Sequence, residues 1–150
     1  MRAIIQRVSR VSVSIGGTVK SSIGEGLLVL LGIEEADLET DAEWLSGKIA
    51  RLRVFPDREG TMNLSLTDTG GEVLVISQFT LYASTRKGNR PSYVRAARPE
   101  KAIPLYEKFI KYLERDAGHK ILTGEFGAYM QVELLNDGPV TLMIDSRNRE

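Results

Sequence analysis

Hydrophobic and polar residues alternate over the first part of the chain, where β-branched side chains are frequent. This period of two predicts a half-buried strand over residues 2–15. Gly16-Gly17 comes next and is typical of a two-residue hairpin turn, so a second strand should begin at Thr18. The chain therefore opens with a predicted β-hairpin.

Two later segments, 26–33 and 72–81, are apolar on both faces. Both are expected to be central strands that other layers cover from either side. Each is followed in the chain by a segment whose apolar residues recur at helical spacing. The first predicted helix starts at Thr40 or Asp41, and the second covers residues 99–115.

The remaining segments predict shorter elements. Residues 56–71 contain one proline and three glycines, which indicates a loop region around a short strand near Leu64. Beyond the second helix, strand-like patterns cover residues 119–123, 126–135 and 139–145. The chain therefore ends in a set of strands.

The elements follow one another as a hairpin, two strand-plus-helix units and the terminal strands. A mixed sheet with two helices on one face and strands packed on the other buries all their apolar faces. With 150 residues, 42% of them apolar, the chain can form one domain with its own core. We therefore expect a single α/β domain over residues 1–150.

Composition excludes several kinds of chemistry. Cysteine is absent, which rules out thiolate catalysis, disulfides and cysteine-based zinc or iron–sulfur sites. The only histidine, His119, follows Gly118 in what reads as an ordinary helix ending, so we do not expect a catalytic base there. Twenty basic residues balance twenty acidic ones, so net charge favours no class of partner.

Nothing in the sequence predicts export or a membrane span. The first residues lack the apolar core and the cleavage site of a signal peptide. The longest apolar candidate runs from Leu27 to Leu31, far short of the roughly 20 residues that cross a bilayer. We expect a cytoplasmic protein.

Polar side chains appear abruptly at the end of the second central strand, in Ser77-Gln78-Phe79-Thr80-Leu81. Sites in α/β sheets are usually built where strands end. In one interpretation the backbone N–H groups of Phe79 and Thr80 face a developing oxyanion, with the Thr80 hydroxyl near the substrate. A strand that simply ends in its ordinary alternation would look the same, and the residue pattern leaves both open.

Residues 82–98 contain no acidic residue but several basic ones, with Tyr82 and Tyr93 between them. Such a strip can follow a phosphate backbone. A solvated loop with scattered charge is the alternative, and the position directly after the polar strand end favours a functional role. The basic residues are Arg86, Lys87, Arg90, Arg95 and Arg98.

The glycine-rich segment 124–130 lacks the Lys-Ser/Thr ending of a P-loop and the helix of a dinucleotide site. Its small residues alternate with Phe126 and Met130. This pattern suits a strand that a planar ligand can lie against. Composition favours the alternative, a bulged strand whose aromatic residues pack in the core.

The segment Asn136–Thr141 contains Gly138-Pro139 between two strand-like runs. Proline donates no N–H, and the residue before it avoids the helical region, so the pair must interrupt any strand ladder here. A simple turn would account for it.

Together, Ser77–Leu81 and Asn136–Thr141 resemble the two signature motifs of the D-aminoacyl-tRNA deacylase family. The opening residues 1–8, the segment 124–130 and the order of the elements are also similar to that family, so the resemblance covers essentially the whole chain. It implies a three-layer α/β/β fold and hydrolysis of the ester that joins a D-amino acid, or mischarged glycine, to tRNA. It also implies a homodimer with each active site at the subunit interface, and no metal or organic cofactor.

The resemblance also implies roles for individual residues. Ser77, Gln78, Phe79 and Thr80 would form the catalytic wall, with backbone groups around Phe79 and Thr80 holding the ester carbonyl. Gly138-Pro139 would have a cis bond and enter the pocket of the partner subunit. The other expected substrate-binding residues are Leu81, Arg7, which braces the Gly-Pro motif, and Phe126 and Met130, which line the adenosine and aminoacyl region. We assign tRNA binding to the basic strip.

Rigid carbonyls of Gly138 and Pro139 would clash with an L side chain, and glycine would escape this rejection. The chemical step stays open between attack by the Thr80 hydroxyl and direct attack by water. Water is favoured because no general base lies near Thr80 in the sequence. Two other classes of function remain: a non-catalytic RNA-binding module, and a hydrolase of small D-amino esters.

Overall fold

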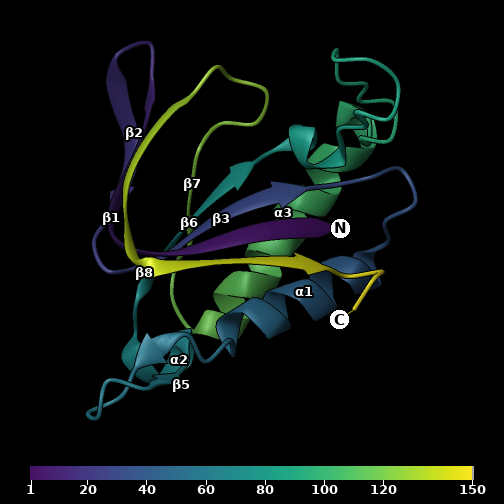
Figure 1. Ribbon diagram of the computed structural model, residues 1–150. Coiled ribbons are helices and arrows are strands. Elements are labelled where there is room, and N and C mark those ends of the chain that lie inside the picture. Colours follow the sequence, from purple (N-terminus) through teal and green to yellow (C-terminus); the bar gives the residue numbers. More distant parts are fainter. Residues whose placement is uncertain (150) are drawn as a thin grey trace.

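The protein is built around a six-stranded mixed sheet in the computed structural model, which describes residues 1–149. Five strands lie in the order β2-β1-β3-β6-β7, and β8 pairs with β1 (Figure 1). β3 pairs in parallel with β6, and β1 is antiparallel to β2, β3 and β8. The strands are β1 (Arg2–Ile15), β2 (Thr18–Ile23), β3 (Gly26–Gly32), β6 (Glu72–Ser77), β7 (Leu122–Thr123) and β8 (Gln131–Asp145).

The predicted opening hairpin is confirmed. β1 and β2 pair up to Ile15 and Thr18, and Gly16 and Gly17 form the turn with φ angles of 56° and 80°. Glycine adopts positive φ at little cost, and two such residues in succession match the right-handed twist of the paired strands.

Two helices cover one face of the sheet, as the sequence predicts (Figure 1). They are α1 (Glu39–Ala50) and α3 (Pro99–Ala117), and they pack against each other. Leu27, Val29 and Leu31 of β3 point into the core beneath them. No helix within residues 1–149 combines the length and the apolar character needed to span a membrane.

A second apolar core lies on the other face of the sheet. Leu28 of β3 and Leu74 of β6 point into it and meet Val11 and Val13 from the distal half of β1. β1 is long enough to serve both layers: its first half pairs with β3, and its second half pairs with β2. The three-layer α/β/β arrangement is therefore confirmed, with both central strands buried on two sides.

Between α1 and β6 the chain forms the predicted loop region. It contains β4 (Phe55–Pro56), β5 (Met62–Leu64) and the single-turn α2 (Leu66–Thr69). Ser65 caps α2 by accepting a hydrogen bond from the Asp68 N–H. The expected short strand near Leu64 is present as β5.

The expectation of one strand over residues 72–81 is wrong in its second half. β6 ends at Ser77, and a 3₁₀ turn, η1 (Phe79–Tyr82), follows. The Gln78 N–H still donates to the Leu31 carbonyl at 2.8 Å, as a strand residue would. Ser77 pairs with Leu31, and the partner strand β3 ends at the next residue, Gly32. Beyond this point the chain has no strand to pair with, and it turns.

The expectations for strands at 119–123 and 126–135 are also too long. β7 covers only Leu122–Thr123, and residues 124–130 form a turn in which Gly127 has a φ of 78°. Gly127, one of the small residues that suggested a strand for a planar ligand, therefore lets the chain turn before β8.

Gly138-Pro139 does not divide the C-terminal segment into two strands. β8 runs through it, but the pairing with β1 breaks, because Arg7 alone faces the four residues 137–140. The side-chain amide of Asn136 donates to the carbonyls of Arg7 at 2.9 Å and Val140 at 3.0 Å. A side chain thus replaces the lost ladder bonds at a bulge, the setting that tolerates proline within a sheet. The Gly138-Pro139 peptide bond is cis.

Candidate active site

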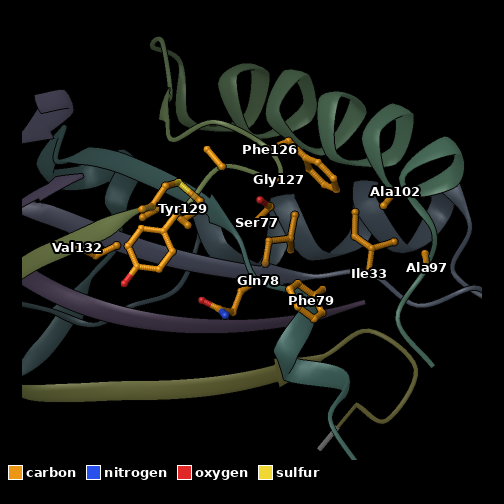
Figure 2. Close-up of a pocket in the computed structure, with 14 residues that line it drawn as sticks. Ile33, Ser77, Gln78, Phe79, Ala97, Ala102, Phe126, Gly127, Tyr129 and Val132 are labelled. Carbon is orange, nitrogen blue, oxygen red and sulfur yellow. The ribbon is translucent and has the colours of Figure 1, made fainter. Parts of the chain in front are cut away.

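A cleft of about 260 Å³ opens where β6 ends. Three parts of the chain form it: the ends of β3 and β6 with η1, the turn before β8, and the start of α3. Figure 2 shows Gln78 and Phe79 on one side and Phe126 and Gly127 across from them. The lining residues are Leu31, Ile33, Ile76, Ser77, Gln78, Phe79, Ala97, Ala102, Phe126, Gly127, Ala128, Tyr129, Met130 and Val132.

The lining of this cleft carries no carboxylate, imidazole, amine or guanidinium. Its polar side chains are Ser77, Gln78 and Tyr129, and the rest are apolar. Among residues 1–149, no three side chains of the metal-binding types are grouped to hold an ion. Within this subunit, the cleft therefore offers backbone groups and a few neutral polar side chains.

Gln78 connects the cleft to the η1 turn. Its side-chain amide donates a hydrogen bond to the Thr80 hydroxyl. Thr80 and Leu81 do not line the cleft of this single chain. The Thr80 side chain is half-buried. The backbone N–H groups of Phe79 and Thr80 begin a 3₁₀ turn, and the first donors of such a turn have no partner within it.

The far wall of the cleft is supported by the core. Phe126 packs edge-on against Tyr106 of α3, with 5.9 Å between ring centroids. The Tyr106 hydroxyl donates to the Val75 carbonyl of β6 at 3.1 Å, and burial raises the pKa of this phenol. Met130 lies close to Gly124: a Cβ added to Gly124 would be 2.5 Å from the Met130 sulfur. Both predicted lining residues, Phe126 and Met130, therefore lie in the cleft wall.

The rim of the cleft leads into the basic strip. Phe79 is 57% exposed and meets Tyr93 edge-on, with ring centroids 5.1 Å apart. Ser84 and Ser92 exchange two backbone hydrogen bonds of 2.8 and 2.9 Å and close a loop between them. Three basic residues lie in that loop and two follow it. All five are exposed: Arg86, Lys87, Arg90, Arg95 and Arg98.

Arg95 differs from the other four, since it is engaged within the chain. Its guanidinium forms an ion pair with Glu34 at 3.0 Å and lies 5.5 Å from the centroid of the Tyr82 ring. Half of its side chain remains exposed, with a relative accessibility of 53%. This residue therefore anchors the base of the loop as well as adding to its charge.

The bulge at Gly138-Pro139 is held from β1. Arg7 donates to the Asp137 carbonyl at 3.2 Å, pairs with the Asp137 carboxylate at 2.9 Å and donates to the Val54 carbonyl at 2.6 Å. Its side chain is only 11% exposed, whereas Gly138 and Pro139 are exposed. One guanidinium thus ties the bulge to the connection between α1 and β4.

The structure divides the predicted site residues into two groups. Ser77, Gln78 and Phe79 meet Phe126 and Met130 in the cleft. The lining of that cleft in the same chain does not include Arg7, Gly138 or Pro139.

Several lining residues were missed by reasoning from the sequence. Ala97 and Ala102 flank the start of α3, and Tyr129 lies on the turn with its side chain largely exposed. The sequence did hold a signal for the two alanines: small residues near the start of a helix leave room for a ligand where that helix crosses the end of a strand. The sequence pattern gives no signal that Tyr129 lines the cleft, because its position depends on how the turn before β8 folds back toward Gln78.

Comparison with known proteins places the chain in one family. The family model described as D-Tyr-tRNA(Tyr) deacylase matches residues 4–145. A D-aminoacyl-tRNA deacylase from Bacteroides thetaiotaomicron is 60% identical over 150 residues, and one from Flavobacterium johnsoniae is 58% identical over the same length. Both alignments cover all of this chain and all of the relative.

Two solved structures share the fold of this chain. A structure described as c-Myc DNA Unwinding Element Binding Protein has a TM-score of 0.90 and 42% identity, and the alignment covers 97% of this chain and 98% of that one. A probable eukaryotic D-amino acid tRNA deacylase has a TM-score of 0.82 over 95% of this chain, and at 15% identity it supports the fold alone. With matches across its whole length, the chain belongs to the D-aminoacyl-tRNA deacylase family.

Proposed function

We propose that the protein hydrolyses the ester bond of D-aminoacyl-tRNA in the cytoplasm and so removes the wrong enantiomer before it enters translation. One observation carries the proposal: an uncharged cleft at the end of β6 borders a turn whose first N–H groups have no partner within that turn, in a chain of this family. The same activity extends to glycine mischarged on tRNA.

The ester carbonyl lies against the start of η1 in this mechanism. The N–H groups of Phe79 and Thr80 stabilise the oxyanion that forms when the carbonyl carbon is attacked. Removing one such donor typically lowers kcat by about 10²–10³-fold. Because backbone donors are held by the turn, they cost no reorganisation during the reaction.

Water is the nucleophile in this proposal. The Thr80 hydroxyl accepts a hydrogen bond from Gln78, and the cleft lining carries no group that would remove its proton. A serine or threonine nucleophile needs such a base within hydrogen-bond reach. As water forms its bond to the carbonyl carbon and the bond to the ribose oxygen breaks, the proton of the water passes to that departing oxygen. Backbone groups and the ribose hydroxyl of the substrate position the water for this step.

The site is completed by a second copy of the chain. Gly138-Pro139 is exposed on its bulge and absent from the cleft of its own subunit, as a segment that enters a partner's cleft would be. Its rigid carbonyls occupy the space that an L side chain needs, so rejection comes from steric clash. Hydrogen and D side chains avoid the clash, so glycyl-tRNA would also be hydrolysed.

The tRNA body lies along the loop between Ser84 and Ser92. The loop contains Arg86, Lys87 and Arg90, and the Phe79–Tyr93 contact joins it to the rim of the cleft. Phosphate contacts of this kind position the substrate and make binding fall as salt rises. The aminoacyl end would then enter the cleft as the acceptor strand follows the loop.

Incubation with D-tyrosyl-tRNA, L-tyrosyl-tRNA and glycyl-tRNA tests the function. The D ester and the glycyl ester should be hydrolysed, and the L ester should remain at the uncatalysed level. Binding to tRNA without hydrolysis of any ester would instead indicate an RNA-binding module. Equal turnover of a short D-amino ester without tRNA would indicate a small-molecule hydrolase.

Replacing Thr80 by Ala tests the nucleophile. If water attacks, the variant should keep hydrolysing D-tyrosyl-tRNA, with a single-turnover rate within about 10-fold of the wild type. That loss corresponds to one hydrogen bond of about 0.5–1.5 kcal/mol. Thr61→Ala, at an exposed position between β4 and β5, is the matched control. A fall to background with unchanged tRNA binding would show that the hydroxyl itself attacks.

A further inference from the structure

The η1 turn, which carries Phe79 and Thr80, is held at its far end by Arg2. One guanidinium nitrogen of Arg2, Nη1, donates to the Leu81 carbonyl at 3.1 Å. Carbonyls in the last turn of a helix have no partner within it, so Arg2 satisfies a group that the turn itself leaves free. The start of β1 is thereby linked to the η1 turn through the Arg2 side chain.

The same guanidinium is oriented by a second partner. Its Nε donates to Asp145 Oδ2 of β8 at 2.8 Å, and the two side chains are 28% and 13% exposed. Arg2 lies opposite Asp145 on one side and opposite Gly32 on the other, so the pair bridges neighbouring strands. Asp145 also accepts backbone N–H groups from residues 147 and 148 at 2.9 and 3.3 Å, which hold its carboxylate in place.

An aromatic contact completes the arrangement. The Arg2 guanidinium lies 4.7 Å from the centroid of the Tyr82 ring, and Tyr82, the last residue of η1, is only 1% exposed. Arg2 therefore meets η1 in two ways, through a carbonyl and through a buried ring. The planar fork of arginine can reach a carboxylate and a carbonyl and stack on a ring at once, which a lysine ammonium cannot do.

We propose that Arg2 is a positioning residue of the active site, which sets the place of the η1 turn and thereby of the Phe79 and Thr80 N–H groups. The proposal rests on the proposed function, because it assumes that these donors face the reacting carbonyl. Arg2 does not line the cleft, so it acts through the turn and not on the substrate.

Catalysis should be more sensitive than binding to this arrangement. Oxyanion donors act only when they point at the oxygen of the transition state, and a displacement of about 1 Å can cost about 10²-fold in rate. The phosphate contacts of the basic loop do not depend on the Leu81 carbonyl. Loss of Arg2 should therefore lower kcat and leave tRNA affinity nearly unchanged.

The experiment compares Arg2→Ala, Arg2→Lys and a matched control, Arg10→Ala. Arg10 lies on the same strand, and its ion pair with Glu133 is largely exposed. Single-turnover hydrolysis of D-tyrosyl-tRNA, the Kd for tRNA and the Tm are measured for each. We expect Arg2→Ala to lose about 10–100-fold in rate, with Kd within about threefold. Arg2→Lys should recover part of the rate, and Arg10→Ala should match the wild type.

Two results would overturn the proposal. One is a single-turnover rate for Arg2→Ala within twofold of the wild type. The other is a loss that disappears when the rate is expressed per folded subunit, which would give Arg2 a purely structural role. If Arg2→Ala does not fold, Arg2→Lys decides, since it keeps the charge and lacks the fork; an unaltered rate there refutes the proposal. An inactive wild type would refute the proposed function and not the placement of η1.

Discussion

Gly138→Ala should reduce the ratio of D-ester to L-ester hydrolysis by at least about 100-fold. Gly138 has a φ of 130°, a region that side chains rarely adopt. A Cβ there would lie 2.7 Å from Cγ2 and 2.9 Å from the backbone N of Val140, and 3.3 Å from a guanidinium nitrogen of Arg7. The neighbouring backbone cannot yield, so the segment that presents the two carbonyls must move.

The measurement is the single-turnover rate on D-tyrosyl-tRNA and L-tyrosyl-tRNA, with the dimer fraction from sedimentation. Gly60→Ala is the matched control, because Gly60 also has positive φ but no atom within 4 Å of the added Cβ. Arg7→Ala releases the Asp137 contacts without altering the glycine. It should lower the ratio by about 10–100-fold, which corresponds to a charge-assisted bond of about 1.5–3 kcal/mol. A wild-type ratio in both variants would show that the segment does not select.

Gly32→Ala should lower the rate on D-tyrosyl-tRNA by about 10–100-fold while the fold survives. A Cβ at Gly32 would lie 3.0 Å from both the Gln78 carbonyl oxygen and the Leu81 Cβ, and 3.3 Å from the Tyr82 ring. The added methyl group would therefore be too close to η1, and the turn would have to shift. Overpacking of this kind costs about 1–3 kcal/mol of stability, whereas a shifted turn removes its donors from the reacting carbonyl.

Thermal unfolding and single-turnover kinetics separate these two effects. Gly24→Ala is the control, since Gly24 has ordinary backbone angles and its added Cβ would meet only the Glu72 carboxylate at 3.6 Å. It should leave both measurements near the wild type. A Gly32→Ala protein with wild-type rate would mean that the position of η1 does not limit hydrolysis.

Local sequence signals were sufficient where short-range physics decides the structure. Gly16-Gly17 between two alternating segments predicts the hairpin, because the turn needs two residues with positive φ. The helical spacing in residues 99–115 likewise predicts α3, which extends two residues further to its glycine C-cap, Gly118. These elements depend on neighbours in sequence.

The η1 turn could not be predicted from local pattern. Its residues directly follow the apolar run of β6, so a strand continuing to Leu81 was the natural expectation. The turn depends instead on contacts with Gly32 and Arg2, which lie about 50 and 80 positions earlier in the chain. Tertiary contacts thus override the local preference at the position where the site is built.

The bulge in β8 was missed for a related reason. Proline within the segment predicted an interruption of the strand ladder, and a simple turn was enough to account for it. Only the structure shows the Asn136 amide joining the carbonyls of Arg7 and Val140 across the gap. The family motifs located Ser77–Leu81 and Gly138-Pro139, but the residue pattern alone left a structural explanation open for each.

The neutral lining of the cleft has a consequence for how the rate of hydrolysis depends on pH. An enzyme whose acid and base are side chains shows a bell-shaped pH profile and slows when either group changes its proton. Here the walls carry no carboxylate, imidazole or amine, and the proposed donors are peptide groups that keep their hydrogens at any physiological pH. Titration of this subunit's cleft walls would then have little effect on hydrolysis across physiological pH, and the ammonium group of the substrate would be the main titrating group in the cleft.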